Sequence, residues 1–267
     1  MADTVAGSEL VAAYQLGAQR LRARTRTVTE AAWTGLGSYD TPDVERFTAL
    51  AADITDAAAS AAAGLSEAFV ASYVAAETGE AVRLPGAAAL VRPVPAEVVY
   101  ARPFHQMWRD LSVGLLWTEA RDRARNFAGT LAYTDAQLAL RSSWTTSMSS
   151  SPRITGYRRV LNSPSCGLCV VASTQRYSRG DLMPIHHRCD CTVEPIVGGS
   201  PNTRVIDGER LELVKRRLAS EDGTYTRAAI RRMKIDVDDL PAVEVRMHGE
   251  MGPVLTFAGQ AFNEGPQ

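Results

Sequence analysis

All four cysteines of the chain lie in one short segment, as a C-x2-C pair followed by a C-x-C pair. Both thiolates of a C-x2-C turn can reach one ion, and the side chains at i and i+2 of C-x-C leave the same face of an extended chain. A histidine in the same segment adds another group with ligand spacing. The spacing therefore predicts a metal centre made of Cys166, Cys169, Cys189 and Cys191, with His186 replacing one cysteine as the alternative.

Four protein ligands leave no open position for water or substrate, so a centre of this kind supports structure rather than catalysis. We expect structural zinc, which contributes ~10–16 kcal/mol to the folding of zinc-finger peptides. Two alternatives remain open from the residues alone, because four cysteines could also form redox or disulfide pairs, or could pack as buried reduced thiols.

Arginines surround the cysteine segment, with few acids among them. A basic face beside a zinc knuckle suits contact with phosphate, and it suits the carboxylates of a neighbouring protein equally well. Interleaved aromatic residues, which would stack on bases, are not evident. The candidates for phosphate or partner contact are Arg158, Arg159, Arg176, Arg179 and Arg188, with Arg153 nearby.

The elements that must position this segment begin with an Ala-rich, helical half. After Thr41, which can cap a helix, and Pro42, which suits a first helical position, apolar residues recur every three or four residues up to Gly79. This stripe comprises Phe47, Leu50, Ile54, Ala58, Ala61, Leu65, Phe69 and Tyr73. Further helices are predicted over about 8–24 and 105–147, with a proline-rich irregular connector before the second of them.

These patterns predict a mainly α fold in three parts. Residues 1–150 form a long-helix bundle, with Pro152 as the boundary. Residues 151–200 form a small zinc-knuckle-like α+β module around the cysteines. Residues 201–267 form a tail with two short helices, GERLELVKRRLAS and TRAAIRRMK, and a β-hairpin that runs from Val243 through PVLTF.

Composition narrows the classes of function. The 267 residues carry a formal net charge of −1 and are 45% hydrophobic, so the chain should fold and has no global attraction to nucleic acid or to an acidic membrane. No signal-peptide pattern and no run of about 18 apolar residues is evident, so we expect neither export nor a membrane span. G-x-S-x-G, H-E-x-x-H, Walker-type and G-x-G-x-x-G motifs are absent from the sequence.

The run RVLNSPSCGLCVVASTQRY followed by GDLMPIHHRCDC resembles the MuF-like minor capsid (minor head) proteins of tailed bacteriophages, particularly those that infect actinobacteria. In that family a C-x2-C pair is followed by P-x-H-x-x-C-x-C. The matching residues here are Cys166, Cys169, Pro184, His186, Cys189 and Cys191. The resemblance covers roughly residues 155–197, and elsewhere it is one of architecture.

This resemblance implies a structural virion component, located in the capsid interior near the portal and in the host cytoplasm during assembly. Its expected partners are portal and capsid proteins, with non-specific contact with packaged DNA and ejection alongside that DNA as further expectations. Two enzymatic alternatives stay open: a zinc-stabilised nuclease that uses His186 and His187, and a capsid maturation protease. The closed ligand set and the lack of a single activated thiol favour the structural function.

Overall fold

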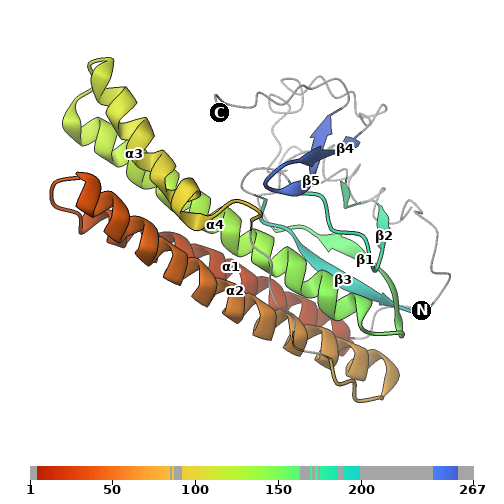
Figure 1. Cartoon of the computed structure of the whole chain (residues 1–267). Coiled ribbons are helices and arrows are strands. Elements are labelled where there is room, and N and C mark those ends of the chain that lie inside the picture. The colour runs from red at the N-terminus through yellow and green to blue at the C-terminus, as the bar shows by residue number, and fades with distance from the viewer. Residues whose placement is uncertain are drawn as a thin grey trace, which may run out of the picture. The chain divides into compact units, whose positions relative to one another are not determined.

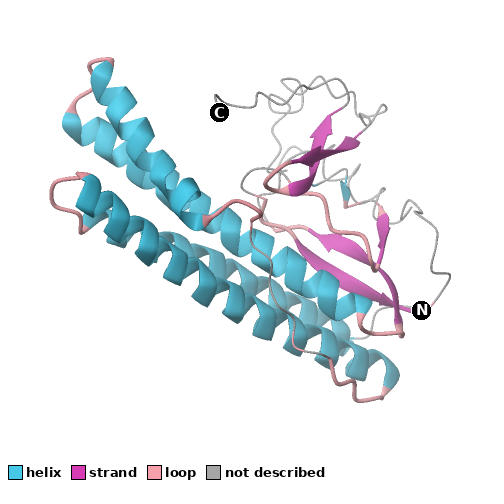
Figure 2. Cartoon of the chain, viewed as in Figure 1, coloured by secondary structure: helices cyan, strands magenta, loops and turns pink. Residues whose placement is uncertain are grey.

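The computed structural model describes residues 5–84, 86, 92–162, 169, 172–173, 175–185, 189–198 and 243–257. The chain divides into two compact units, Met1–Ser151 and Pro152–Gln267. Long helices build the first unit, and two small antiparallel sheets lie in the second (Figures 1 and 2). The predicted mainly α fold is confirmed. The two short helices predicted within residues 201–242 lie outside the described residues.

Four helices form the described part of the bundle: α1 (Val5–Thr34), α2 (Thr41–Thr78), α3 (Ala96–Ser112) and α4 (Trp117–Ser149). Helices α1, α2 and α4 pack on one another, and α3 packs on α2 and α4. The prediction of one continuous helix over 105–147 is wrong, because the helix is interrupted between the end of α3 and the start of α4. Gly114 lies there at φ 90°, a left-handed conformation that glycine adopts without strain.

The start of α2 differs from the prediction by one residue. Asp40, and not Thr41, is the cap, and its side chain accepts a hydrogen bond from the Asp43 N–H. The buried Asp43 carboxylate in turn accepts backbone N–H bonds from Ser38 at 2.8 Å and from Tyr39 at 2.7 Å. These bonds satisfy donors of the α1–α2 loop and hold it against the helix start.

Replacing Asp43 by Asn should make the bundle less stable and less sensitive to acid. The Tyr39 and Ser38 N–H bonds lower the pKa of Asp43 below the ordinary value of 3.8, more than burial raises it. A lowered folded-state pKa means that the stabilisation is present above pH 3.8 and is lost as the pH falls through the folded-state value. Urea unfolding at pH 6 and pH 3 tests this. The loss between the two should be smaller in Asp43→Asn than in the wild type and in the exposed control Glu45→Gln.

Aromatic side chains fill both ends of the bundle. At one end, the Trp33 ring lies 4.5 Å from Phe104 and 5.2 Å from Phe47 between ring centroids. At the other end, Tyr14 stacks on Phe69 at 4.2 Å. Between them α4 presents fully buried alanines at every fourth position, which allows close helix approach: Ala120, Ala124, Ala128, Ala132 and Ala136.

Helix α2 buries Phe47, Ala58, Phe69 and Tyr73 of the predicted stripe, but two of the predicted positions are exposed. Leu50 is 44% exposed and Ala61 is exposed, whereas Ala51 and Ala62 are buried. By length and composition alone, α2 could cross a membrane, a test that the core helix of a bundle also passes. Here α2 packs on α1, α3 and α4, so its apolar character serves the bundle interior.

The second unit contains a three-stranded antiparallel sheet in the order β2-β1-β3. Its strands are β1 (Ile154–Val160), β2 (Arg176–Ser178) and β3 (Thr192–Val197). Gly156 is needed in β1, because an added Cβ would lie 2.5 Å from the Tyr177 carbonyl oxygen. The predicted hairpin is present as β4 (Val243–His248) and β5 (Gly252–Phe257).

The hairpin is hydrogen-bonded to Ile185, which lies shortly before Cys189 and Cys191 in the chain. The Ile185 N–H donates to the Pro253 carbonyl oxygen at 3.2 Å, and the Leu255 N–H donates to the Ile185 carbonyl oxygen at 2.7 Å. The β4–β5 hairpin therefore helps to build the cysteine module, although it lies far along the chain from the cysteines.

Candidate metal centre

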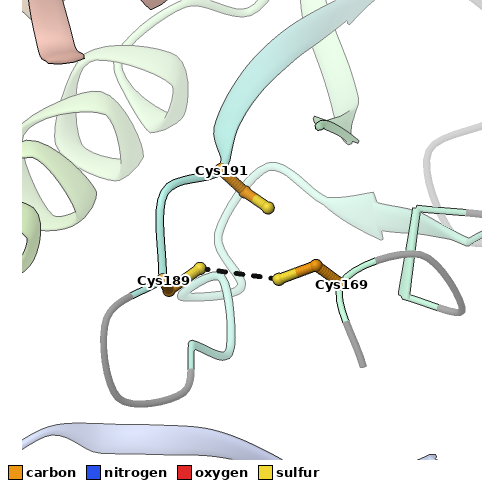
Figure 3. Close-up of side chains that lie close together, drawn as sticks. All are labelled: Cys169, Cys189 and Cys191. Carbon is orange, nitrogen blue, oxygen red and sulfur yellow. Dashed lines mark hydrogen bonds between the residues drawn. The ribbon is translucent and has the colours of Figure 1, made fainter. Parts of the chain in front are cut away.

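Three of the predicted metal ligands come together in the second unit. Cys169, Cys189 and Cys191 are each at most 2% exposed, and their sulfur atoms lie within 4.8 Å of one another. Figure 3 shows the three sulfur atoms turned toward one another. The Cys169 and Cys189 sulfur atoms are 3.7 Å apart. In a tetrahedral zinc site with Zn–S bonds of ~2.3 Å, the sulfur atoms are separated by about 3.8 Å. The cluster is therefore compatible with a metal site.

These three cysteines form no disulfide with one another in this structure. A disulfide needs sulfur atoms about 2.0 Å apart, well below the separation between Cys169 and Cys189. Among the described cysteines, the arrangement fits shared ligation better than disulfide pairing.

Strand pairing and a helical turn hold the three ligands in place. Cys189 and Cys191 directly precede β3, whose first residue, Thr192, pairs with Val160 at the end of β1. The Asn162 side-chain amide donates to the Asp190 carboxylate at 2.6 Å, which holds the residue between the two cysteines. On the other side, a helical turn fixes Cys169, since its carbonyl oxygen accepts from the Ser173 N–H at 2.9 Å.

Arg159 lies fully buried beside the sulfur atoms. One of its guanidinium nitrogens is 3.6 Å from the Cys169 sulfur and 3.5 Å from the Cys189 sulfur. The other terminal nitrogen donates to the Pro184 carbonyl oxygen. Burial acts to lower the pKa of Arg159, but the neighbouring cysteine sulfurs outweigh it and raise that pKa, so the side chain is a permanent cation.

The Cys191 thiol resists ionisation beside the other two cysteines. A hydrogen bond with Cys169 lowers the pKa of Cys191, but its hydrogen bond with Cys189, burial and the charge of Cys189 together raise it to about 12. A bound metal ion removes this obstacle, because it replaces the protons and carries the positive charge itself.

The remaining predicted site residues have different placements. Cys166, His186 and Arg188 lie outside the described residues, as does His187, so the fourth ligand stays a prediction. For Arg159 the structure differs from the predicted surface role, because its guanidinium is buried.

The other basic candidates that the structure describes lie on or near the surface of the second unit. Arg158 forms a two-pronged ion pair with Glu194, with both N–O distances at 2.7 Å. Arg176 and Arg153 are exposed, and Arg179 donates to the Ile154 carbonyl oxygen at 3.3 Å. With Arg159 buried and Arg158 paired to an acid, the basic face is smaller than the sequence predicts.

Two features of the described structure are not predicted by the sequence analysis. The first is the inward direction of Arg159, for which the signal is strand alternation: Tyr157 and Arg159 share the buried face of β1, and Arg158 points away. The second is a group of exposed apolar side chains at the turn between α3 and α4, for which the signal is Gly114 in the middle of a helical pattern.

Together, the long-helix bundle and the buried three-thiol cluster define a helical protein with a small module organised around a candidate metal centre. The chain belongs to the VG15 protein family, whose model matches residues 9–215 and so spans both units. This is a phage-associated family of viral proteins, which indicates the virion or the host cytoplasm during infection as the location of the chain. Searches of curated proteins and of solved structures returned no match.

Proposed function

We propose that the chain is a minor head protein of a tailed phage, of the MuF-like type, that acts as a structural component at the portal. The family match across residues 9–215 is the observation that supports this proposal, because a single phage-associated family model covers both the bundle and the cysteine module. In this proposal the bundle binds a partner protein, and zinc in the cysteine module holds that module rigid.

A surface suited to partner binding lies at the turn between α3 and α4. We call it the apolar tip, and it comprises four side chains with these exposed fractions: Trp108 45%, Val113 70%, Leu116 68% and Trp117 42%. The two tryptophan rings lie 6.2 Å apart, and Trp117 also meets Tyr39 of the α1–α2 loop at 5.7 Å. Exposed apolar groups gathered at one place mark interaction sites, and tryptophan dominates the binding energy of such interfaces.

Charged residues of both signs surround the apolar tip. Arg123 is exposed beside it, and Arg121 lies near Tyr39. Acids offset these arginines, since Asp110 is 3.9 Å from Arg123 and Asp122 also lies near Tyr39. The apolar side chains are therefore the main feature that a partner can recognise, and we assign the fitting apolar pocket to the portal protein.

Replacing both Trp108 and Trp117 by Ala should abolish stable association with the portal protein encoded by the same phage. Loss of one interface tryptophan costs about 2 kcal/mol or more, which is roughly a 30-fold weaker Kd. Co-expression, pull-down and titration of the purified pair measure the effect. Leu16→Ala is the matched control, because Leu16 is equally exposed, at 46%, on α1.

The same experiment can contradict the proposal. Equal affinity of the double variant and Leu16→Ala would exclude the apolar tip as the docking surface. Absence of the wild-type chain from purified virions, measured by mass spectrometry, would exclude the minor head function itself. Metal-dependent nicking of DNA that is lost on His186→Ala would instead support the nuclease alternative.

A further inference from the structure

A buried guanidinium needs an anion, and among the described residues the sulfur atoms of the cysteine cluster are the groups near Arg159 that can serve as one. Its side chain is 0% exposed, and no carboxylate among the described residues forms an ion pair with it. An unpaired buried charge would cost several kcal/mol. The neighbouring Arg158 pairs with Glu194 instead, so two adjacent arginines of β1 have opposite environments.

We infer that Arg159 is a positioning residue of the metal centre, which donates to the Cys169 and Cys189 thiolates and neutralises charge that the metal leaves on them. This inference rests on the proposed zinc centre. The three described thiolates and one zinc ion leave a single negative formal charge, which one guanidinium cancels. With Cys166 as the fourth ligand the centre would carry one further negative charge, and with His186 it would not. Because outer hydrogen bonds orient metal ligands and tune their basicity, their loss weakens metal binding.

Arg159 also connects the ligands to the C-terminal hairpin. Its second terminal nitrogen donates to the Pro184 carbonyl oxygen, and the next residue, Ile185, is hydrogen-bonded to Pro253 and Leu255 of β5. The guanidinium is therefore held by a backbone carbonyl oxygen as well as by the cysteines. This second attachment fixes the direction of the guanidinium, with its other terminal nitrogen toward the two sulfur atoms.

The test uses the full chain with Arg159→Met, Arg159→Lys and the control Arg158→Met. Zinc affinity, measured by competition with a chromophoric chelator, should fall about 10–100-fold in Arg159→Met. Arg159→Lys should recover part of this loss, because it keeps the charge but cannot reach two sulfur atoms with one planar group. Arg158→Met should bind zinc as the wild type does, since Arg158 faces Glu194.

A spectroscopic readout separates this role from general destabilisation. With Co²⁺ in place of zinc, the sulfur-to-metal charge-transfer band of Arg159→Met should move to lower energy, because thiolates that lose a hydrogen-bond donor become richer in electrons. A merely structural role would reduce the amount of metal bound and leave the band position unchanged. Folding of each variant is followed by far-ultraviolet circular dichroism, and Arg159→Lys keeps the test decisive if Arg159→Met does not fold.

Each outcome has one meaning. Equal zinc affinity and equal band positions for Arg159→Met and Arg158→Met, with a wild-type chain that binds zinc, would overturn the role of Arg159 alone. A wild-type chain that binds neither zinc nor Co²⁺ would overturn the metal centre and this inference with it. A graded loss from wild type through Arg159→Lys to Arg159→Met, accompanied by the band shift, would support both.

Discussion

Cys189→Ser, or removal of metal by a strong chelator, should unfold the cysteine module and leave the helical bundle folded. The described sheet has only three short strands, so the centre is expected to supply a large part of its stability. Structural zinc contributes ~10–16 kcal/mol to folding in zinc-finger peptides, which matches or exceeds the whole stability of an ordinary domain. The bundle has its own aromatic core within Met1–Ser151, and that core contains none of the three cysteines.

Thermal melts followed by circular dichroism and limited proteolysis measure this result. Most of the helical signal should survive in Cys189→Ser, and proteolysis should leave a fragment close to residues 1–151. Arg176→Ala, an exposed substitution in β2 of the same module, is the control and should behave as the wild type. Added zinc should reverse the effect of the chelator. A melt that the chelator does not change would contradict the structural role of the centre.

Trp33→Ala should destabilise the bundle by about 3–5 kcal/mol, the usual cost of removing a fully buried aromatic side chain. Trp33 is 0% exposed, and its ring contacts those of Tyr39, Phe47 and Phe104 at the end of the bundle where α1, α2 and α3 meet. The cavity left behind is too enclosed by neighbouring rings to collapse fully. For a unit of this size, the change corresponds to a Tm lower by roughly 10 °C.

Trp108→Ala is the matched control, because it removes the same side chain from a position that is 45% exposed. Its free energy of unfolding should stay within about 1 kcal/mol of the wild type. Urea unfolding monitored by circular dichroism at 222 nm gives both values. Similar losses for the two variants would mean that Trp33 is not the centre of the core that the ring contacts indicate.

The buried charged residues of the bundle could not be predicted from the hydrophobic pattern of the sequence. Tyr100 donates to the Asp135 carboxylate at 2.8 Å, and Arg92 forms an ion pair with the same carboxylate. Arg22, fully buried, donates to Gln137 at 2.6 Å. Charged side chains are expected at the surface when the sequence alone is considered. Here a partner far along the chain offsets the free-energy cost of burying each of them.

Local spacing was enough to predict what depends on neighbours in the chain. The C-x-C and C-x2-C pairs predict convergent thiols because two or three residues set the direction of each side chain, and the hairpin follows from alternation around a turn. The helices follow from the recurrence of apolar residues every three or four positions. Two local features were not predicted correctly: the interruption at Gly114 was missed, and the cap of α2 was placed one residue too late. Each involves only one or a few residues, yet the interruption at Gly114 creates the apolar tip.

The amino-acid sequence by itself determined the mainly α bundle, the clustering of the cysteines and the residue types of a metal centre, since all of these depend on local spacing. Only the tertiary structure decided which partners meet across long separations. Strand pairing turns Arg159 toward Cys169 and Cys189, and helix packing leaves Trp108 and Trp117 in solvent while burying Trp33. The physical reason is that burial and charge pairing depend on the whole packed chain, whereas spacing depends only on the nearest few residues.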